Sequence, residues 1–247
     1  MSTILKVIII PSYNETLALP KLLTELRSEL TGNEAVIVMD DSEASISTEI
    51  RNTCLDIIDG YEFQFIFENS GKKQGRGSAI RRGMHLADST FKSLQHVIEC
   101  DADGSHRVED ILRVKNSEYE VDLLIGSRYL EGSRIVGWPF SRRVFSWFLN
   151  HLIPAMTKVP VSDITNGLRR YSKTAVNKIL ETKQENSGFI YLSEQALIVK
   201  NADLLIAEIP IVFVDRTLGK STVTWREISN SLLGVTKLLA SNLVRNN

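Results

Sequence analysis

The amino-acid sequence predicts an α/β fold, a mostly parallel sheet flanked by helices on both faces. Short, continuous runs of β-branched residues recur along the chain, as in strands that are buried on both sides. Segments with apolar residues at helical spacing separate these runs, an alternation typical of parallel sheets. Polar segments follow several of the runs directly, and open sheets of this kind bind ligands beyond the carboxyl ends of their strands. The fold class therefore also predicts where a functional site lies.

The first half of the chain carries the most regular alternation. Strands are predicted at residues 6–10, 35–39, 63–67 and 96–99. Helices are predicted at residues 19–30, 46–58 and 78–94. Turn-forming residues at 31–33 end the first helix, and a loop rich in glycine and lysine at 71–77 precedes the third.

The second half is less regular, without internal repeats or a clear linker. Its predicted elements are a strand at 121–126, an amphipathic helix at 141–156, a turn at 163–167 that leads into an extended segment at 168–171, a bent or paired strand at 204–214 and a helix at 224–243.

Composition and charge limit the range of functions. The chain has 247 residues, of which 43% are hydrophobic, enough for one large α/β domain or a domain with an appendage. The formal net charge is −1, so no overall basic field favours a nucleic-acid partner. Cys54 and Cys100 offer neither a disulfide framework nor the spacing of zinc ligands, which favours a reducing cytosol. Without a signal peptide or an apolar run of about 20 residues, we expect a soluble or peripheral protein.

Two carboxylates follow the strand predicted at 96–99 and form the most informative motif of the chain. Asp101 and Asp103 are two residues apart, so their side chains project to the same side of an extended segment. Paired carboxylate oxygens suit Mg²⁺ or Mn²⁺, which keep positions open for phosphate oxygens. The alternative is a solvated turn, where aspartate is common. Polar residues at 13–15 and 40–42 also follow strands, and we expect all three segments to line one edge of the sheet.

Six segments, in order along nearly the whole chain, resemble the GT-A-fold family 2 glycosyltransferases, most closely the dolichyl-phosphate or polyprenyl-phosphate mannose synthases. They are residues 9–15, 38–42, 101–103, 126–129, 161–169 and 210–216. The first three are widespread in the family, whereas the last three are typical of the polyprenyl-phosphate branch. The resemblance implies a GT-A domain over residues 1–223 and a C-terminal amphipathic interface helix over residues 224–247.

For the donor, the resemblance implies a sugar-nucleotide site. The residues that it implies there are Pro11, Tyr13, Glu15, Asp40, Asp41, Asp101, Ala102, Asp103, Arg216 and Lys220. Carboxylates accept hydrogen bonds from base and ribose groups, and Tyr13 offers a flat, partly apolar wall. For Tyr13 and Glu15 the alternative is the start of a helix with an acid in its first turn. Lys220 precedes a serine where many relatives carry the lysine after it, so its role stays open.

The same resemblance implies a Mg²⁺ or Mn²⁺ site formed by Asp101, Asp103 and Ser105, with Asp103 and Arg216 as the catalytic residues. In the family this position is often glutamine or serine, and Ser105 offers a neutral oxygen, which is a weaker ligand than a carboxylate. A cation there bridges the diphosphate oxygens and stabilises the departing nucleoside diphosphate. Because the site is already rich in oxygen, we expect His106 to face solvent or cap a helix rather than bind the metal.

For the acceptor phosphate, the resemblance implies Arg128, Arg142 and Ser146. Arg142 and Ser146 are four residues apart and would share a helix face. Guanidinium groups bind phosphate through paired, charge-assisted hydrogen bonds. Asp163 either orients an acceptor-site arginine or caps a local turn.

The implied reaction is the inverting transfer of mannose from GDP-mannose to dolichyl or polyprenyl phosphate. A phosphate monoester is largely dianionic near neutral pH, with a second pKa of about 6, so it needs no general base. Two alternatives stay open: a transferase that uses a UDP-sugar such as UDP-glucose with a polyprenyl phosphate or another acceptor, and a catalytically degenerate scaffold subunit. A nicotinamide dehydrogenase is disfavoured, since no glycine-rich turn follows the first strand.

A lipid acceptor implies contact with a membrane surface. The helix at 141–156, with Trp147 and Phe148, and the helix at the C-terminus are amphipathic enough to lie in the interface, although ordinary core packing explains such stripes equally well. We expect a peripheral protein at the cytosolic face that docks transiently or uses a membrane-anchoring partner protein.

Overall fold

The computed structural model describes residues 3–184, 186, 188 and 190–216, and it has the mixed α/β fold that the sequence predicts. The strands are β1 (Lys6–Ser12), β2 (Glu34–Asp40), β3 (Gln64–Asn69), β4 (His96–Glu99), β5 (Leu123–Ser127), β6 (Arg134–Val136), β7 (Arg169–Ser172), β8 (Ile206–Pro210) and β9 (Val212–Val214). The α-helices are α1 (Ala18–Leu26), α2 (Ala44–Ile58), α3 (Arg76–Thr90), α4 (Val108–Lys115), α5 (Phe140–Thr157), α6 (Lys173–Glu181) and α7 (Tyr191–Asn201).

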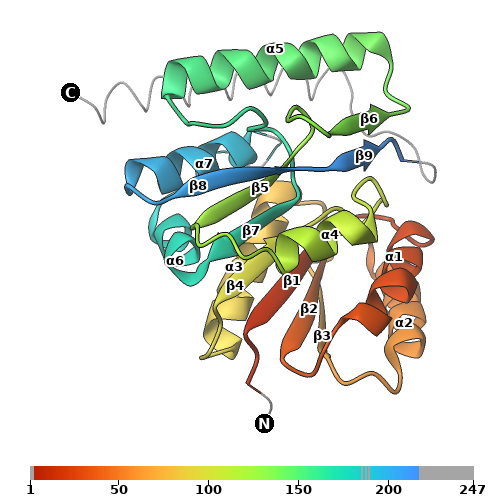
Figure 1. Cartoon of the computed structure of the whole chain (residues 1–247). Coiled ribbons are helices and arrows are strands. Elements are labelled where there is room, and N and C mark those ends of the chain that lie inside the picture. Colours follow the sequence, from red (N-terminus) through yellow and green to blue (C-terminus); the bar gives the residue numbers. More distant parts are fainter. Residues whose placement is uncertain (1–2, 185, 187, 189, 217–247) are drawn as a thin grey trace.

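Seven strands form one sheet in the order β3-β2-β1-β4-β7-β5-β8 (Figure 1). All neighbours in this sheet are parallel except β7, which runs antiparallel to both β4 and β5. β6 and β9 form a separate parallel pair next to α5. The chain passes directly from β8 to β9, so the strand predicted at 204–214 is bent and serves both sheets.

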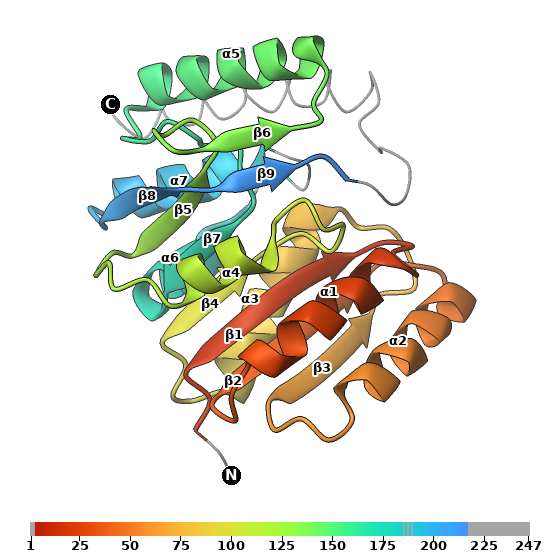
Figure 2. The same ribbon diagram turned by 45° about the vertical axis from the view of Figure 1, so that its right-hand side comes forward.

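Two apolar clusters cover the two faces of the main sheet. Along β1, Ile8 and Ile10 pack on one face with α1, α2 and α4, whereas Val7 and Ile9 pack on the other with α3, α6 and α7. This division follows from the alternation of side chains along a strand. Figure 2 shows α1 and α2 in front of the sheet and α3 behind it.

The structure confirms every strand predicted in the first half, with small changes at the ends. The helix predicted at 78–94 begins earlier, at Arg76, and ends at Thr90. Sequence analysis missed α4, β6, α6 and α7. The helix predicted at 224–243 and the domain boundary at residue 223 lie outside the described residues. Among those that are described, no helix combines the length and apolar character needed to cross a bilayer.

Candidate active site

The polar segments that follow β1, β2 and β4 meet at one edge of the sheet. Asp41 donates its backbone N–H to the carbonyl oxygen of Ser12 at 2.9 Å, which joins the ends of β1 and β2. Burial, and then repulsion from Asp103, raises the pKa of Glu15, so the segment after β1 faces the acidic turn after β4. The expected convergence of the three segments is therefore confirmed.

Tyr13 is the most accessible of the residues predicted to contact the donor nucleoside. Its side chain is 39% exposed, and Nζ of Lys73 lies 4.6 Å from the centroid of its ring. Pro11 pairs with Met39 within the sheet, and Ala102 is buried. An open aromatic face with a cation beside it can receive a flat, polar ring.

Asp40 and Asp41 are already bonded within the protein. The buried carboxylate of Asp40 accepts from Ser42 and Asn69. Each oxygen of Asp41 accepts two hydrogen bonds, from the hydroxyl of Ser70, the guanidinium of Arg82 and the backbone N–H groups of Gln74 and Gly75. Asp41 therefore fixes the loop at 70–75 beside Tyr13. Direct contact of either carboxylate with a nucleoside stays a prediction.

Asp101 is held by a largely buried arginine from the start of α3. Nε of Arg76 donates to Oδ1 of Asp101 at 2.7 Å, and Nη1 of Arg76 lies 2.5 Å from Oε1 of the buried Glu99. Burial by itself raises the pKa of Asp101, but the charge of Arg76 outweighs it and holds this pKa below its ordinary value. Asp101 is therefore ionised at neutral pH, with its orientation set by Arg76.

One carboxylate oxygen of Asp103 accepts hydrogen bonds, and the other lies beside the guanidinium of Arg216. Oδ1 accepts the backbone N–H of Ser105 at 3.0 Å and also the hydroxyl of Ser105. Oδ2 lies 3.6 Å from Nε of Arg216, beyond ordinary hydrogen-bonding distance. Ser105 is only 4% exposed and directs its proton at Asp103, and its role as a metal ligand stays a prediction.

The expectation that His106 faces solvent or caps a helix is wrong. Its imidazole is buried, and Nδ1 accepts the backbone N–H of Asp101 at 3.1 Å. Since Nδ1 is the acceptor, Nε2 carries the proton and donates to Oδ1 of Asn166 at 3.1 Å. Asn166 in turn donates to the carbonyl oxygen of Gly126. His106 thus joins the acidic turn to the end of β5.

The donor set of the acidic turn fits a divalent cation that brings further ligands with it. Oδ2 of Asp101 and Oδ2 of Asp103 are the oxygens that the hydrogen bonds above leave available. Within the described part of the chain, no cluster of three or more His, Cys, Asp or Glu side chains could hold a metal. Mg²⁺ and Mn²⁺ bound through few carboxylates take their other ligands from phosphate oxygens and water, and the residues present suit that arrangement.

Arg128 follows β5 and is firmly held by Asp163. Nε and Nη2 of Arg128 donate to the two oxygens of Asp163, each at 2.7 Å, and Nη2 also donates to Thr165 at 2.8 Å. The backbone N–H of Arg128 donates to the same carboxylate at 2.9 Å. Both side chains are buried. Asp163 therefore orients Arg128, while the binding of an acceptor phosphate by this arginine stays a prediction.

Two of the three residues predicted for the acceptor phosphate, Arg128 and Arg142, contact a buried tryptophan that sequence analysis missed. The centroid of the Trp138 ring lies 4.1 Å from Cζ of Arg142 and 5.0 Å from Cζ of Arg128. Ser146 accepts a hydrogen bond at 2.8 Å from Tyr129, the neighbour of Arg128. Arg142 and Ser146 face inward from α5, as their spacing predicts.

Strand β9 joins the acidic turn to these arginines. Val214 donates its backbone N–H to the carbonyl oxygen of Ser105 at 3.1 Å. Oδ1 of Asp215 then accepts from Nη1 of Arg142 at 2.8 Å, while Arg216 lies beside Asp103. The arginines and the acidic turn therefore belong to one site. Lys220 lies outside the described residues.

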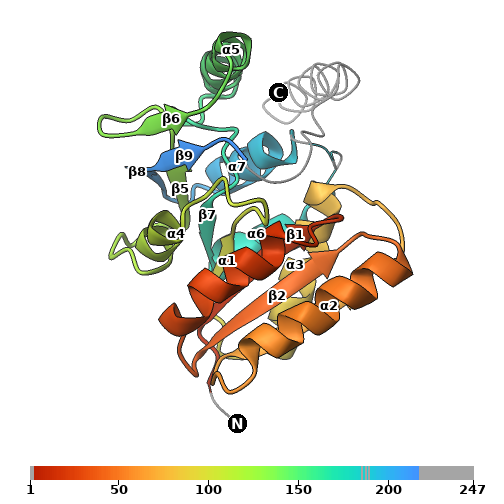
Figure 3. The same cartoon turned by 90° about the vertical axis from the view of Figure 1, so that its right-hand side faces the viewer.

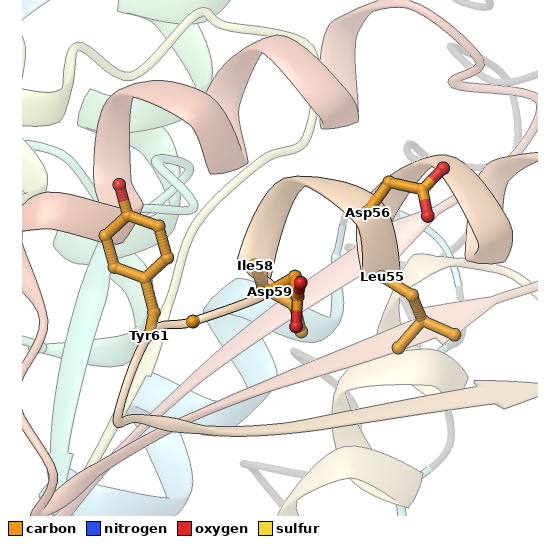
Figure 4. Close-up of a pocket in the computed structure, with 6 residues that line it drawn as sticks. Leu55, Asp56, Ile58, Asp59 and Tyr61 are labelled. Carbon is orange, nitrogen blue, oxygen red and sulfur yellow. The ribbon is translucent and has the colours of Figure 1, made fainter.

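One surface hollow lies away from these residues. It lies at the C-terminal end of α2, the end that leads back to the start of β3 (Figure 4), and is lined by Leu55, Asp56, Ile58, Asp59, Gly60 and Tyr61. None of the predicted site residues lines this hollow.

A signal in the sequence could have identified Arg76. A positive residue in the first turn of a helix opposes the helix dipole, so a carboxylate partner is needed nearby. At Gly167, a Cβ atom would collide with the guanidinium of Arg76, which explains the glycine in that turn. No comparable signal marks Trp138 or Asp215, since their partners come from distant parts of the chain.

The chain is similar in sequence to two polyprenol-phosphate enzymes. It is 29% identical over 93% of its length to an undecaprenyl-phosphate mannosyltransferase from Micrococcus luteus, of which 91% is covered. It is 28% identical over 92% of its length to a polyprenol monophosphomannose synthase from Mycolicibacterium smegmatis, of which 84% is covered.

Solved structures share the fold at low sequence identity. Glucosyl-3-phosphoglycerate synthase from Mycobacterium tuberculosis, in complex with Mn²⁺, UDP and glucosyl-3-phosphoglycerate, matches with a TM-score of 0.63 and 14% identity over 96% of this chain and 79% of that one. A mannosyltransferase from Pyrobaculum calidifontis, in complex with GDP-Man and Mn²⁺, matches with a TM-score of 0.60 and 16% identity over 94% of this chain and 63% of that one. The model of glycosyl transferase family 2 matches residues 7–180. The chain therefore belongs to glycosyl transferase family 2 and is a glycosyltransferase.

Proposed function

We propose that this enzyme transfers mannose from GDP-mannose to a dolichyl or other polyprenyl phosphate, with inversion at the anomeric carbon. The observation that carries the proposal is the placement of Arg216 beside Asp103 and of the Arg128–Arg142 pair directly next to it. One anion, the diphosphate of the donor, can be bound beside Arg216, and a second, the acceptor phosphate, beside Arg128 and Arg142. The names of the two bacterial relatives support the sugar and the lipid phosphate, and the complex of the Pyrobaculum enzyme supports GDP-mannose and a divalent cation.

On the donor side, Tyr13 and Glu15 contact the nucleoside, while Pro11, Asp40, Asp41 and Ala102 build the edge of the sheet around it. Asp103 and Asp101, with the hydroxyl of Ser105 nearby, would hold Mg²⁺ or Mn²⁺. Such an ion supplies positive charge against the diphosphate. Arg216 adds a second positive charge, and this preorganised arrangement stabilises the departing nucleoside diphosphate. Lys220 is also proposed to contact the diphosphate.

On the acceptor side, Arg128, Arg142 and Ser146 hold the phosphate in line with the anomeric carbon. The phosphate is largely dianionic near neutral pH and attacks without a general base. His106 supports this proposal, because both of its ring nitrogens are already bonded within the protein. The contribution of the arginines is therefore positioning, which lowers the barrier by fixing the reacting atoms at close range.

A lipid acceptor also requires a surface that meets the membrane, and we propose the outer face of α5. Large apolar side chains stand exposed there, among them Phe140, Val144, Trp147, Phe148 and Met156. The same helix carries Arg142 and Ser146 on its inner face, so a phosphate held there is one helix diameter from the lipid. The proposal places the protein peripherally, at the cytosolic face of a membrane.

The proposal is tested with purified protein, Mn²⁺ or Mg²⁺, GDP-mannose and a short polyprenyl phosphate, with mass spectrometry of the lipid product. We expect β-linked mannosyl phosphate from an α-linked donor, and about a 100-fold or larger loss for Asp103→Asn. Asp56→Asn, on the exposed side of α2, is the matched control and should retain full activity.

If the enzyme released UDP from a UDP-sugar but no GDP from GDP-mannose, the donor would be a UDP-sugar and not GDP-mannose. Binding of GDP-mannose without turnover with any phosphate acceptor would favour a scaffold and refute the enzyme reaction proposed here.

A further inference from the structure

The two arginines of the acceptor side differ in how firmly a carboxylate holds them. Arg128 makes a twofold, fully buried pair with Asp163. Arg142 makes one hydrogen bond with Asp215, and the two side chains are 31% and 30% exposed. A single contact in partly solvated surroundings contributes little to stability. The pair of Arg142 and Asp215 can therefore exchange its partners, whereas the pair of Arg128 and Asp163 is permanent.

Arg216, the next residue along the chain, lies beside a carboxylate on the donor side. Its Nε lies 3.6 Å from Oδ2 of Asp103, the oxygen that is proposed to face the divalent cation. A carboxylate thus lies against Arg142, where the acceptor phosphate is proposed to bind. A guanidinium lies against Asp103, where the cation is proposed to bind.

The backbone holds Asp215 in this position. Its N–H donates to the carbonyl oxygen of Val136 at 2.8 Å, which extends the pairing of β6 and β9. Gly137 has a φ of +85°, and a Cβ atom there would lie 3.0 Å from Cβ of Asp215. Glycine therefore permits both the turn and the close approach, so Asp215 is placed by the fold and not by chance.

The surrounding charges favour exchange with an anion. Burial, together with the neighbouring cations Arg216 and Arg128, lowers the pKa of Arg142 even though Asp215 opposes the shift. Three guanidinium groups thus share this corner of the site, and the half-exposed carboxylate of Asp215 is the counter-charge nearest to Arg142. A phosphate dianion, with more charge and more acceptor oxygens, can replace it there.

We propose that Asp215 and Arg216 are an internal substitute for the two charged ligands, so that loading one side of the site prepares the other. This rests on the proposed function. A phosphate on Arg142 repels the carboxylate of Asp215. A cation on Asp103 repels Arg216, which turns to the diphosphate. The carboxylate of Asp215, which accepts the backbone N–H of Arg216 at 3.2 Å, is then drawn away from Arg142 while the backbone of Asp215 stays bonded to Val136. Each event removes a competitor from the other side, which is positive coupling between two ligands.

Calorimetric titration of a short, soluble prenyl phosphate, without and with Mn²⁺ and GDP, tests this coupling directly. We expect the wild-type protein to bind the prenyl phosphate at least fivefold more tightly when Mn²⁺ and GDP are present. Asp215→Asn should bind it several-fold more tightly than wild type in their absence, with the coupling reduced to less than twofold. Glu181→Gln, which removes another exposed ion pair, is the control and should match wild type.

Three results would overturn the proposal: no coupling in the wild type, unchanged coupling in Asp215→Asn, or weaker prenyl phosphate binding by that variant. The last would make Asp215 an ordinary positioning residue for Arg142. A parallel titration with inorganic phosphate shows whether the headgroup alone is sufficient. Transfer activity is measured separately, so coupling without turnover refutes the proposed function alone, and turnover without coupling refutes this inference alone.

Discussion

The proposed donor side and the proposed acceptor side differ in how firmly their charged groups are held. At the donor edge, Asp41 accepts four hydrogen bonds and Asp101 is fixed by Arg76. On the acceptor side, Arg128 is equally fixed, but Arg142 has a single, half-exposed partner. Figure 3 shows the corresponding difference in architecture: the donor edge belongs to the main sheet, while α5 stands apart above β6 and β9. A rigid donor edge and a partly adaptable acceptor side are what the proposed function requires of a site for one soluble and one lipid substrate.

The sharpest test of this comparison removes the permanent carboxylate of the acceptor side. Asp163→Ala leaves the guanidinium of Arg128 buried without its partner, and we expect the free energy of unfolding to fall by about 3–5 kcal/mol in urea titrations. Asp215→Ala should cost less than about 1 kcal/mol, since its pair is half exposed. Similar losses for the two variants would contradict the distinction between a permanent and an exchangeable pair.

The second test changes an apolar residue in β1, the strand that leads to the donor edge. Ile8→Ala, in the buried centre of β1, should lower the free energy of unfolding by about 3 kcal/mol through the loss of packing. Because β1 carries no acceptor residue, the affinity of the folded protein for prenyl phosphate should stay the same. A weaker affinity in the Ile8→Ala variant, measured by calorimetry below its unfolding temperature, would show that the packing of β1 shapes the acceptor side even without a donor ligand.

The third test weakens the donor edge at Arg76. Arg76→Lys keeps the charge but cannot bond Asp101 and Glu99 together, because lysine lacks the planar fork of arginine. We expect about a 10–100-fold loss of Mn²⁺ affinity in the presence of GDP, the range found when a residue that orients a ligand is changed. Arg82→Lys, at the neighbouring carboxylate Asp41, provides the comparison. Unchanged Mn²⁺ affinity in Arg76→Lys would remove Asp101 from the proposed metal site.

The smallest effect is a dependence on pH that arises outside the site. Burial, helped by Arg170 and Lys6, lowers the pKa of His96 to about 4. Since the unfolded chain binds the proton more readily, the free energy of unfolding should fall between pH 6.5 and pH 4, by about 1–2 kcal/mol for this partly buried side chain. His96→Gln should flatten this part of the stability profile. The same slope in the variant would assign the pH dependence to other groups.

The sequence predicted the donor half well because local patterns decide it. The run at residues 7–10 is apolar throughout and is buried on both faces, so no competing structure fits it. The acidic residues 101–103 could be placed at the edge of the sheet, since the strand before them was clear. By contrast, α4 has only eight residues with charges throughout, and β6 has three, so neither gives a distinct period.

The partners of the charged residues could not be predicted in the same way. Asp41 is surrounded by groups from a loop and a helix some 30–40 residues later, and Asp215 meets an arginine 73 residues earlier. Such contacts depend on how whole elements pack. His106 illustrates the error that follows: a polar residue after an acidic turn suggested exposure, but the approach of Asn166 and Phe213 buries it.

The position of β7 between β4 and β5 affects how the sheet forms while the chain is being synthesised. Because β7 lies between β4 and β5 in the sheet, the hydrogen-bonding groups along one side of β4 have no strand partner until residues 169–172 leave the ribosome. During synthesis the first four strands therefore present an open edge, the kind of surface that pairs with other chains. Chains truncated before residue 169 should accordingly aggregate, and those that include β7 should not.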